Sequence, residues 1–201
     1  MYDVRRIMVW AMRCRHSRGF GVQSPWAYSF IRYVINEHYP YYAYKSLEGL
    51  HVGQAWLSRK LSRLYFRMSN HLQPRCVVNF GRRADVFSDY VKAGCRSSSV
   101  ISMDSLVNGG AHEDRLADFP LIDFARFEPC AGCKEAYRAA LARVGAGSMF
   151  VVEGIHMSRL GRELWAEVMR DGRTGITFDL FYCGIVCFDK KRYRQNYIVN
   201  F

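Results

Sequence analysis

Two side chains that can carry protons follow the clearest short apolar run of the sequence. The run Met149 to Val152 predicts a buried strand; Glu153 comes directly after it, and His156 lies three residues further on. A carboxylate and an imidazole at the end of a strand can act as general base or supply two ligands to a divalent ion. Because no third ligand accompanies them, we predict catalytic roles for Glu153 and His156 and no metal site.

The sequence contains seven cysteines, an odd number that favours free thiols in a reducing, cytoplasmic location. Cys130 and Cys133 precede a predicted helix, where the pKa of a thiol can fall, and Cys183 and Cys187 lie on one side of a predicted strand. Together they could form a four-thiolate zinc site, or the first two a redox pair, but their separation is not typical of a zinc ribbon. We favour ordinary packing, since a free cysteine behaves as a small apolar side chain.

Strands and helices alternate through the middle of the chain. Four apolar runs separated by turns or helical segments predict strands, at Cys76 to Phe80, Ser99 to Met103, Leu121 to Phe124 and Met149 to Val152. This alternation is typical of a parallel sheet covered on both faces. Three β-rich runs without a helix between them follow, at Ile176 to Tyr182, Ile185 to Phe188 and Tyr197 to Phe201. We expect these runs to pair antiparallel at one edge of the sheet.

The first third of the chain has a helical pattern. Val4, Ile7, Met8 and Ala11 recur at helical spacing among arginines, so this apolar stripe needs the body of the protein, another subunit or a membrane surface as its partner. We favour packing on the body. The 201 residues, 50% of them hydrophobic, suit one structural domain, in which residues 1–73 form a helical extension packed on an α/β core of residues 74–201.

The formal charge of +11 raises the attraction for anionic partners. Much of it lies in the N-terminal half, including Arg59, Lys60, Arg63 and Arg67, and it represents either solvated helix faces or a surface for an anionic partner. The aromatic cluster from Tyr39 to Tyr44 either pins a loop onto the core or stacks on a ring-bearing ligand. We predict no transmembrane segment, because the apolar run Ile7 to Met12 is too short to span a membrane.

Four stretches of the sequence are similar to one protein family. They are Val151 to Ser158, Asp179 to Val186, Tyr197 to Phe201 and the leader Arg15 to Pro25. These motifs resemble class I S-adenosylmethionine (SAM)-dependent methyltransferases, in particular the small O-methyltransferase-like proteins of Bacteroidetes. The resemblance covers nearly the whole chain. It implies a Rossmann-like methyltransferase fold, with a mostly parallel sheet, an antiparallel C-terminal edge and an N-terminal helical extension, and it implies SAM as cofactor.

The resemblance also implies cofactor-binding residues. In the family, the first strand ends in an acid and a glycine-rich turn follows; the corresponding residues here are Asn79, Gly81, Arg83 and Asp85. Arg83 could pair with the cofactor carboxylate, whereas for Asp85 we favour capping of the next helix. Asp104 corresponds to the acid at the end of the second strand that holds the ribose hydroxyls.

The sequence departs from the family at three places and leaves two functions open. Only the first glycine of the turn is kept, Ala125 stands in place of an aspartate, and Gly154 replaces one of two paired acids. One function is O- or N-methyl transfer to an unknown small-molecule or protein acceptor, with Glu153 or His156 as base. The other is a catalytically silent relative that binds partners through its basic surface. The added side chains in the turn predict weak or absent SAM binding.

Overall fold

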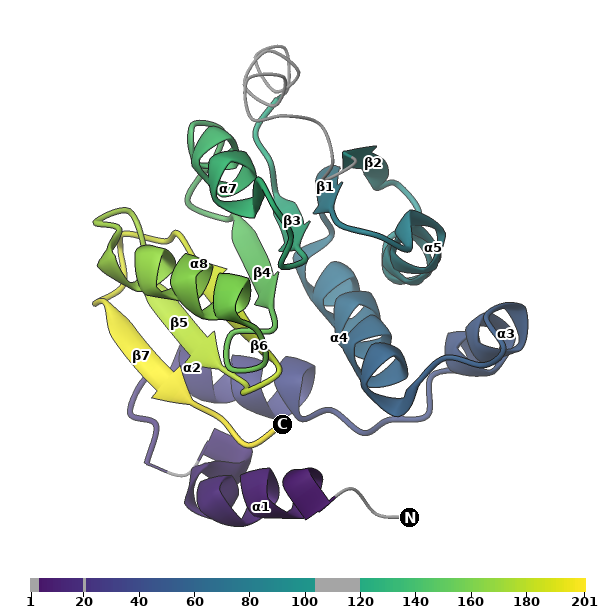
Figure 1. The fold of residues 1–201 in the computed structure, drawn as a ribbon, viewed down its shortest axis with the longest axis horizontal. Coiled ribbons are helices and arrows are strands. Elements are labelled where there is room, and N and C mark those ends of the chain that lie inside the picture. Colours follow the sequence, from purple (N-terminus) through teal and green to yellow (C-terminus); the bar gives the residue numbers. More distant parts are fainter. Residues whose placement is uncertain (1–3, 20, 104–119) are drawn as a thin grey trace.

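The computed structural model describes residues 4–19, 21–103 and 120–201 (Figure 1). The N-terminal part is helical: α1 (Val4–Arg13), the 3-10 helix η1 (Cys14–Gly19), α2 (Pro25–Phe30), the π-helical turn η2 (Ile31–Ile35), α3 (Tyr42–Leu50) and α4 (Trp56–Leu72). The alternating part that follows contains β1 (Cys76–Phe80), α5 (Ala84–Gly94), β2 (Ser99–Met103), β3 (Phe124–Phe127), α7 (Cys133–Leu141), β4 (Met149–Glu153), α8 (Arg159–Arg170), β5 (Ile176–Asp179), β6 (Cys183–Cys187) and β7 (Gln195–Ile198).

The described strands form one sheet in the order β2-β1-β3-β4-β6-β5-β7. All neighbours pair parallel except β6, which runs antiparallel to β4 and to β5. The predicted fold class, a mostly parallel sheet with an antiparallel strand in its C-terminal part, is confirmed. One detail differs, because β7 pairs parallel with β5. The chain reverses direction after β5 and again after β6, so β7, which lies on the free side of β5, runs parallel to β5.

The third strand begins later than the sequence pattern indicated. It is Phe124–Phe127 and not Leu121 to Phe124. The carboxylate of Asp123 accepts hydrogen bonds from the backbone N–H groups of Arg75 and Cys76, at 2.8 and 2.9 Å. Asp123 thus ties the loop before β3 to the start of β1, and the strand begins only after this link.

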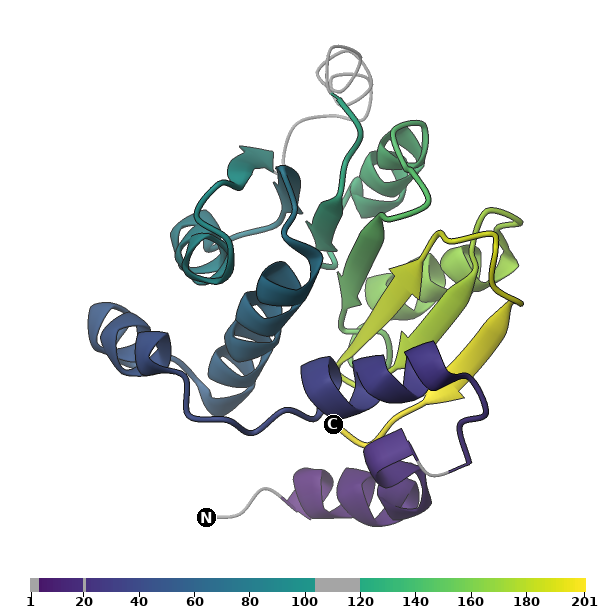
Figure 2. The ribbon, with the colours of Figure 1, turned by 180° about the vertical axis from the view of Figure 1, so that it is seen from behind.

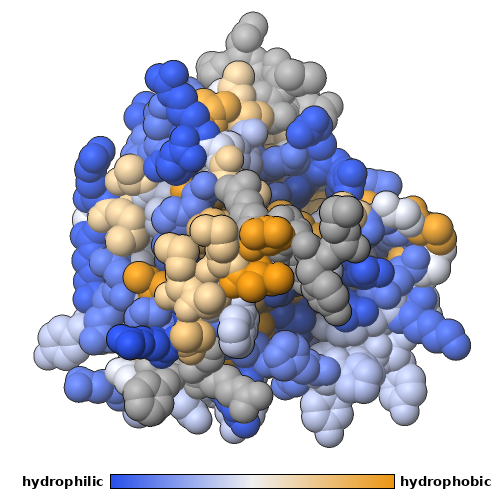
Figure 3. Space-filling model, turned by 60° about the horizontal axis from the view of Figure 1, so that its bottom comes forward, coloured by the Kyte–Doolittle hydropathy of each residue, from blue (hydrophilic) through white to orange (hydrophobic). Residues whose placement is uncertain are grey.

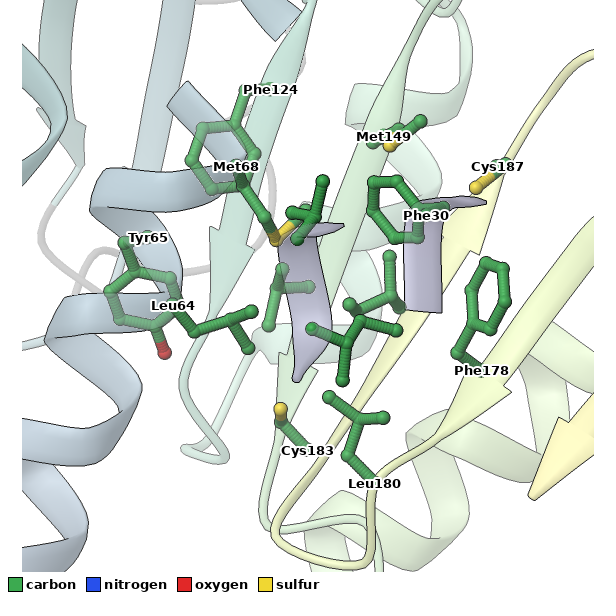
Figure 4. Close-up of a cluster of buried hydrophobic side chains, with 14 of the residues drawn as sticks. Phe30, Leu64, Tyr65, Met68, Phe124, Met149, Phe178, Leu180, Cys183 and Cys187 are labelled. Carbon is green, nitrogen blue, oxygen red and sulfur yellow. The ribbon is translucent and has the colours of Figure 1, made fainter. Parts of the chain in front are cut away.

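Helices cover both faces of the sheet (Figures 1 and 2). Successive residues of a strand point to opposite faces, so Val77 packs in one apolar cluster and Val78 in the other. The first cluster contains side chains of α2, η2, α4 and α5, and the second contains those of α7 and α8. Figure 4 shows part of the first cluster, in which Phe30 of α2 and Met68 of α4 lie against the sheet. That the helical segment 1–73 folds only together with residues 74–201 stays a prediction.

The apolar stripe of α1 does not pack on the body of the protein. Val4 is 70% exposed, and Ile7, Met8 and Ala11 are exposed as well, so the predicted packing of this stripe is wrong. The helix is held at its other end, where Arg13 pairs with the carboxylate of Asp179 at 2.9 Å. Figure 3 brings this end of the molecule forward and shows apolar side chains gathered within a hydrophilic surface. Among the described residues, no helix is long and apolar enough to cross a membrane.

Candidate functional site

The carboxyl ends of three parallel strands meet beside the N-terminal half of α4. There β1, β3 and β4 contribute Asn79, Arg126 and Glu153, because neighbouring parallel strands end at the same edge of a sheet. A cavity of about 450 Å³ opens at this edge, between α4 and the first turn of α5. We call it the edge cavity. Its polar lining consists mainly of hydroxyls, arginines and carboxylates, among them Ser58, Ser62, Arg82, Arg83, Glu128 and Glu153.

Arg126 links the three strand ends. Its Nε donates to Oε1 of Glu153 at 2.6 Å, its Nη1 donates to Oδ1 of Asn79 at 2.9 Å, and its Nη2 donates to Oε2 of Glu128 at 3.3 Å. A further bond from Nη1 reaches the backbone oxygen of Arg82 at 2.9 Å. Since Arg126 is buried and every one of these acceptors is fixed on a strand end or the turn beside it, the guanidinium forms a rigid bridge, which we call the Arg126 bridge.

Arg126 and its neighbour Tyr65 both have raised pKa values. Burial disfavours the Arg126 cation, but the nearby charges, that of Glu153 foremost, outweigh burial and raise the pKa of Arg126 above its ordinary value. Tyr65 of α4 donates its hydroxyl to the same Oε1 of Glu153. Burial, together with the Glu153 charge, raises the pKa of Tyr65 well above its usual range. Both donors therefore keep their protons at neutral pH, and Glu153 can take a proton on Oε1 only when one of them withdraws.

Gly81, the glycine predicted to face a cofactor, is closely covered by protein atoms. A Cβ added at Gly81 would lie 2.6 Å from Cβ of Glu128 and 3.0 Å from Nη1 of Arg126. The carboxylate of Glu128 also accepts a hydrogen bond from the backbone N–H of Arg82 at 2.8 Å, which holds Glu128 against the turn. A ligand can reach the backbone of Gly81 on this side only if Glu128 moves away.

The remaining predicted cofactor residues have different positions. Arg83 lines the edge cavity and donates from Nη1 to Oγ of Ser58 at 3.1 Å. The predicted capping by Asp85 is wrong, because α5 begins after Arg83, whose backbone is left-handed with φ 55, and no side chain caps the helix. Asp85 lies in the first turn of α5, where its negative charge interacts favourably with the positive end of the helix dipole. Asp104 lies outside the described residues.

His156 lies in surroundings of its own. Its Nε2 is hydrogen-bonded to Oδ2 of Asp179 at 2.7 Å, and its ring stacks on Phe181 with 5.3 Å between the ring centroids. Asp179 also pairs with Arg13, so the imidazole is part of a cluster that anchors α1. His156 does not line the edge cavity, and within the described ranges no hydrogen bond joins it to Glu153. The two predicted catalytic residues thus belong to separate networks.

The cysteines do not gather into one site. Cys133 packs in the cluster with α7 and α8, whereas Cys183 and Cys187 pack in the cluster on the opposite face of the sheet, so the four-thiolate alternative is wrong. A hydrogen bond with Cys130, together with burial, raises the pKa of the Cys133 thiol, opposite to the fall that its place before a helix suggested. No group of three potential metal ligands occurs in the part of the chain that the structure describes.

Sequence reasoning missed the three residues that organise this site, Tyr65, Arg126 and Glu128. A signal for Arg126 was present, because an arginine within the apolar run Phe124–Phe127 is rare unless its charge is paired. Glu128 follows two residues later, and a strand brings residues two positions apart to the same face. Tyr65 carried no such signal, since its position fits the apolar stripe of α4.

No protein-family model and no curated protein matches the sequence. Solved structures do match the fold. The SAH-bound methyltransferase from Podospora anserina is 9% identical, with a TM-score of 0.54 over 81% of this chain and 92% of its own. The O-methyltransferase from Bacillus cereus in complex with SAH is 8% identical, with a TM-score of 0.52 over 72% of this chain and 90% of its own. At these identities the likeness shows the fold alone, and that fold is the class I methyltransferase fold.

Proposed function

We propose that this chain is a SAM-dependent methyltransferase that binds SAM in the edge cavity and transfers its methyl group to an oxygen or nitrogen atom of a small-molecule or protein acceptor. One observation carries the proposal. A cavity with two carboxylates, Glu128 and Glu153, opens at the carboxyl ends of the strands in a methyltransferase fold. Ligands of open α/β sheets bind at this edge. The two structures compared above are SAH complexes, which supports the same assignment.

The residues of the edge cavity fit SAM in charge and size. Glu153 offers an acceptor for an ammonium group and negative charge for a sulfonium, while Arg83 and Ser58 offer donors for a carboxylate. A volume of about 450 Å³ lies within the range of small-molecule sites. The fit is poorer beside Gly81, where Glu128 fills the space, so we expect weak binding.

SAM would supply an electrophilic methyl group when bound. Of the side chains lining the edge cavity, Glu153 is best placed to accept a proton from the methyl acceptor, because it lies at the end of the central strand β4. Arg126 and Tyr65 hold its Oε1 and must loosen before that oxygen can act as base. His156, in its separate network, stays a second candidate base. Most of the rate would come from positioning the acceptor against the methyl group.

The Arg126 bridge also favours a second function, in which the chain keeps the fold as a silent binding or assembly module. A guanidinium bonded to Asn79, Glu128 and Glu153 stabilises the empty edge cavity without any ligand. If opening the bridge costs ~3 kcal/mol, a SAM affinity of ~1 μM becomes ~100 μM.

Calorimetric titration with SAM at up to millimolar concentration tests the proposal. We expect weak binding by the wild type and about tenfold tighter binding by Glu128→Ala, because this change opens the space beside Gly81. Glu163→Ala is the matched control, since it removes a carboxylate of α8 that pairs with Lys134 and Arg159 and does not line the edge cavity. Absence of binding by both the wild type and Glu128→Ala would leave the silent module as the function. Low-micromolar binding by the wild type, unchanged in Glu128→Ala, would instead contradict the inhibitory role of the bridge.

A further inference from the structure

A second cavity, of about 530 Å³, lies on the opposite side of α4 from the edge cavity. It is bounded by the end of η2, by α3, by the first half of α4 and by Phe201; we call it the basic cavity. On α4, residues 57, 58, 61, 62 and 65 line the edge cavity while residues 56, 59, 60, 63 and 67 line this one, as helical periodicity requires. The side chains that line the basic cavity include one carboxylate, Glu37, and four cations: Arg59, Lys60, Arg63 and Arg67.

Arg67 is buried beside this cavity without a carboxylate partner. Its Nε donates to the backbone oxygen of Val34 at 2.6 Å, its Nη2 to that of Ile35 at 3.0 Å, and its Nη1 to the hydroxyl of Tyr44 at 3.4 Å. These bonds cap the C-terminal end of η2, yet all three acceptors are neutral. No carboxylate lies within ion-pair distance of Arg67 in the described ranges. A buried cation is costly unless it is paired, so this side of the cavity attracts an anion.

Two of the other cations, Lys60 and Arg63, lie against aromatic rings. Nζ of Lys60 is 4.2 Å from the ring centre of Phe201, and the guanidinium carbon of Arg63 is 4.8 Å from that of Tyr44. Arg63 also pairs with Glu48, with 2.7 Å from Nε to Oε1. Ring contacts orient a cation without neutralising it. These contacts orient Lys60 and Arg63, while the charge left without a carboxylate partner in the described ranges is that of Arg67.

Aromatic side chains also form part of the cavity wall. Tyr39 lines the basic cavity and is 72% exposed, and Trp56 lines it from the first turn of α4. A planar ring that enters the cavity can stack on such side chains, a contact worth about 1–3 kcal/mol per base in nucleic-acid complexes. Arginine and lysine next to aromatic surface form the combination that binds a phosphate joined to a planar base.

We propose that the basic cavity binds a nucleotide, with its phosphates on Arg59, Lys60 and Arg67 and its base against Tyr39 and Trp56. Two sources share this chemistry: a free nucleotide and the end of a single-stranded nucleic acid. A doubly charged phosphate suits a site with several cations better than a single carboxylate does, because arginine pairs with phosphate in a bidentate fashion. This proposal is independent of the SAM proposal, since the two cavities lie on opposite sides of α4.

Calorimetric titration of the wild-type protein with four probes separates the parts of the proposal. The probes are ADP, adenosine, inorganic phosphate and a 5′-phosphorylated single-stranded octanucleotide. We expect ADP to bind at least about tenfold more tightly than adenosine, which lacks the charge, and than phosphate, which lacks the ring. Tighter binding of the octanucleotide than of ADP, with an affinity that falls steeply with salt, would identify nucleic acid as the source. The reverse order would identify a free nucleotide.

Variants test the named residues. Arg59→Gln should weaken ADP binding about fivefold to tenfold. Arg96→Gln changes an exposed arginine in the turn after α5, outside both cavities, and should leave ADP binding unchanged. Glu37→Gln should tighten binding, because it removes the lining carboxylate. Tyr39→Ala should weaken the binding of ADP and not that of phosphate. Arg67→Met should abolish ADP binding. Because Arg67 also caps η2, this variant could lose binding by misfolding, so the exposed Arg59 provides the test that does not depend on folding.

Three results would overturn the proposal. The first is no binding of ADP or the octanucleotide at millimolar concentration. The second is equal affinity for ADP and phosphate, which would show that no ring is bound. The third is displacement of ADP by SAM, which would show that both occupy one cavity. Because SAM binding is measured in a separate titration, failure of the nucleotide proposal leaves the SAM proposal intact, and the reverse also holds.

Discussion

Arg126 and Arg67 are both 7% exposed, yet the first is bonded to two carboxylates and the second to neutral oxygens only. They lie on opposite sides of α4, one beside the edge cavity and one beside the basic cavity. Beside the edge cavity the protein itself supplies the anions that pair with Arg126, and one of them, Glu128, covers Gly81. Beside the basic cavity the protein supplies no anion to the guanidinium of Arg67. A buried charge that is satisfied internally disfavours a ligand, and one that is not satisfied favours a ligand.

The largest effect is expected for Arg126→Met. This change leaves Glu153 and Glu128 at the carboxyl edge without their shared cation, and breaking such a pair costs about 3 kcal/mol of the free energy of unfolding. Urea denaturation measures the loss. Arg138→Met is the control, because Arg138 pairs with Glu167 at the surface, where solvent screens an ion pair and the loss should be much smaller. Similar losses in both variants would show that burial of the Arg126 bridge has no energetic consequence.

Arg67→Met should cost less, about 1–2 kcal/mol. The change leaves the backbone oxygens of Val34 and Ile35 without donors, but it also removes a buried charge, and water in the basic cavity can solvate the two oxygens. ADP should raise the melting temperature of the wild type and not that of this variant. A loss as large as that of Arg126→Met would mean that neutral oxygens stabilise Arg67 as well as carboxylates stabilise Arg126, and would contradict the contrast between the two arginines.

Tyr65→Phe is expected to cost about 1 kcal/mol, since it removes one of two donors to Glu153 and leaves Arg126 in place. Tyr90→Phe is a close control. Tyr90 is also fully buried, but its hydroxyl has no hydrogen-bond partner among the described residues, so losing the hydroxyl should be neutral or stabilising. Denaturation should therefore show a loss of stability for Tyr65→Phe and no loss for Tyr90→Phe. Equal destabilisation would show that the bond from Tyr65 to Glu153 contributes nothing.

The fold was predictable because its signals are local. Apolar runs placed β1, β2 and β4. The start of β3 was missed because the side chain of Asp123 bonds to another strand, a contact that no local pattern shows. The packing of α1 was also wrongly predicted, because an apolar stripe at helical spacing does not show which surface the helix contacts.

The candidate site was less predictable because it depends on pairs distant in sequence. Asn79 and Glu153 were each predicted near a strand end and Arg126 was not, and which of the three bond to one another depends on strand order. Comparison with family motifs drew attention to the carboxylate missing at Ala125 and away from the arginine beside it. The capping expected of Asp85 failed because Arg83 adopts a left-handed conformation and takes the capping position itself.

The smallest effect concerns His71, which lies one helical turn beyond Arg67 on α4 and packs its ring edge-on to Phe30 at 5.5 Å. Partial burial of its ring against the protein lowers the pKa of His71, although the residue as a whole is exposed. A folded-state pKa below the unfolded value, about 6.5, means that stability is fully present above that pH and is lost as the pH falls through it, because the unfolded chain takes up the proton first. The wild type should therefore lose more unfolding free energy between pH 7.5 and pH 5 than His71→Gln does. This extra loss should be smaller than the cost of Tyr65→Phe. Above pH 7.5 the difference in unfolding free energy between the wild type and His71→Gln should stay constant. A difference that stays constant down to pH 5 would contradict this. His71 is exposed and can also release its proton, whereas Arg67 is buried and cannot. On the same helix, only the arginine therefore requires an anion from outside the protein.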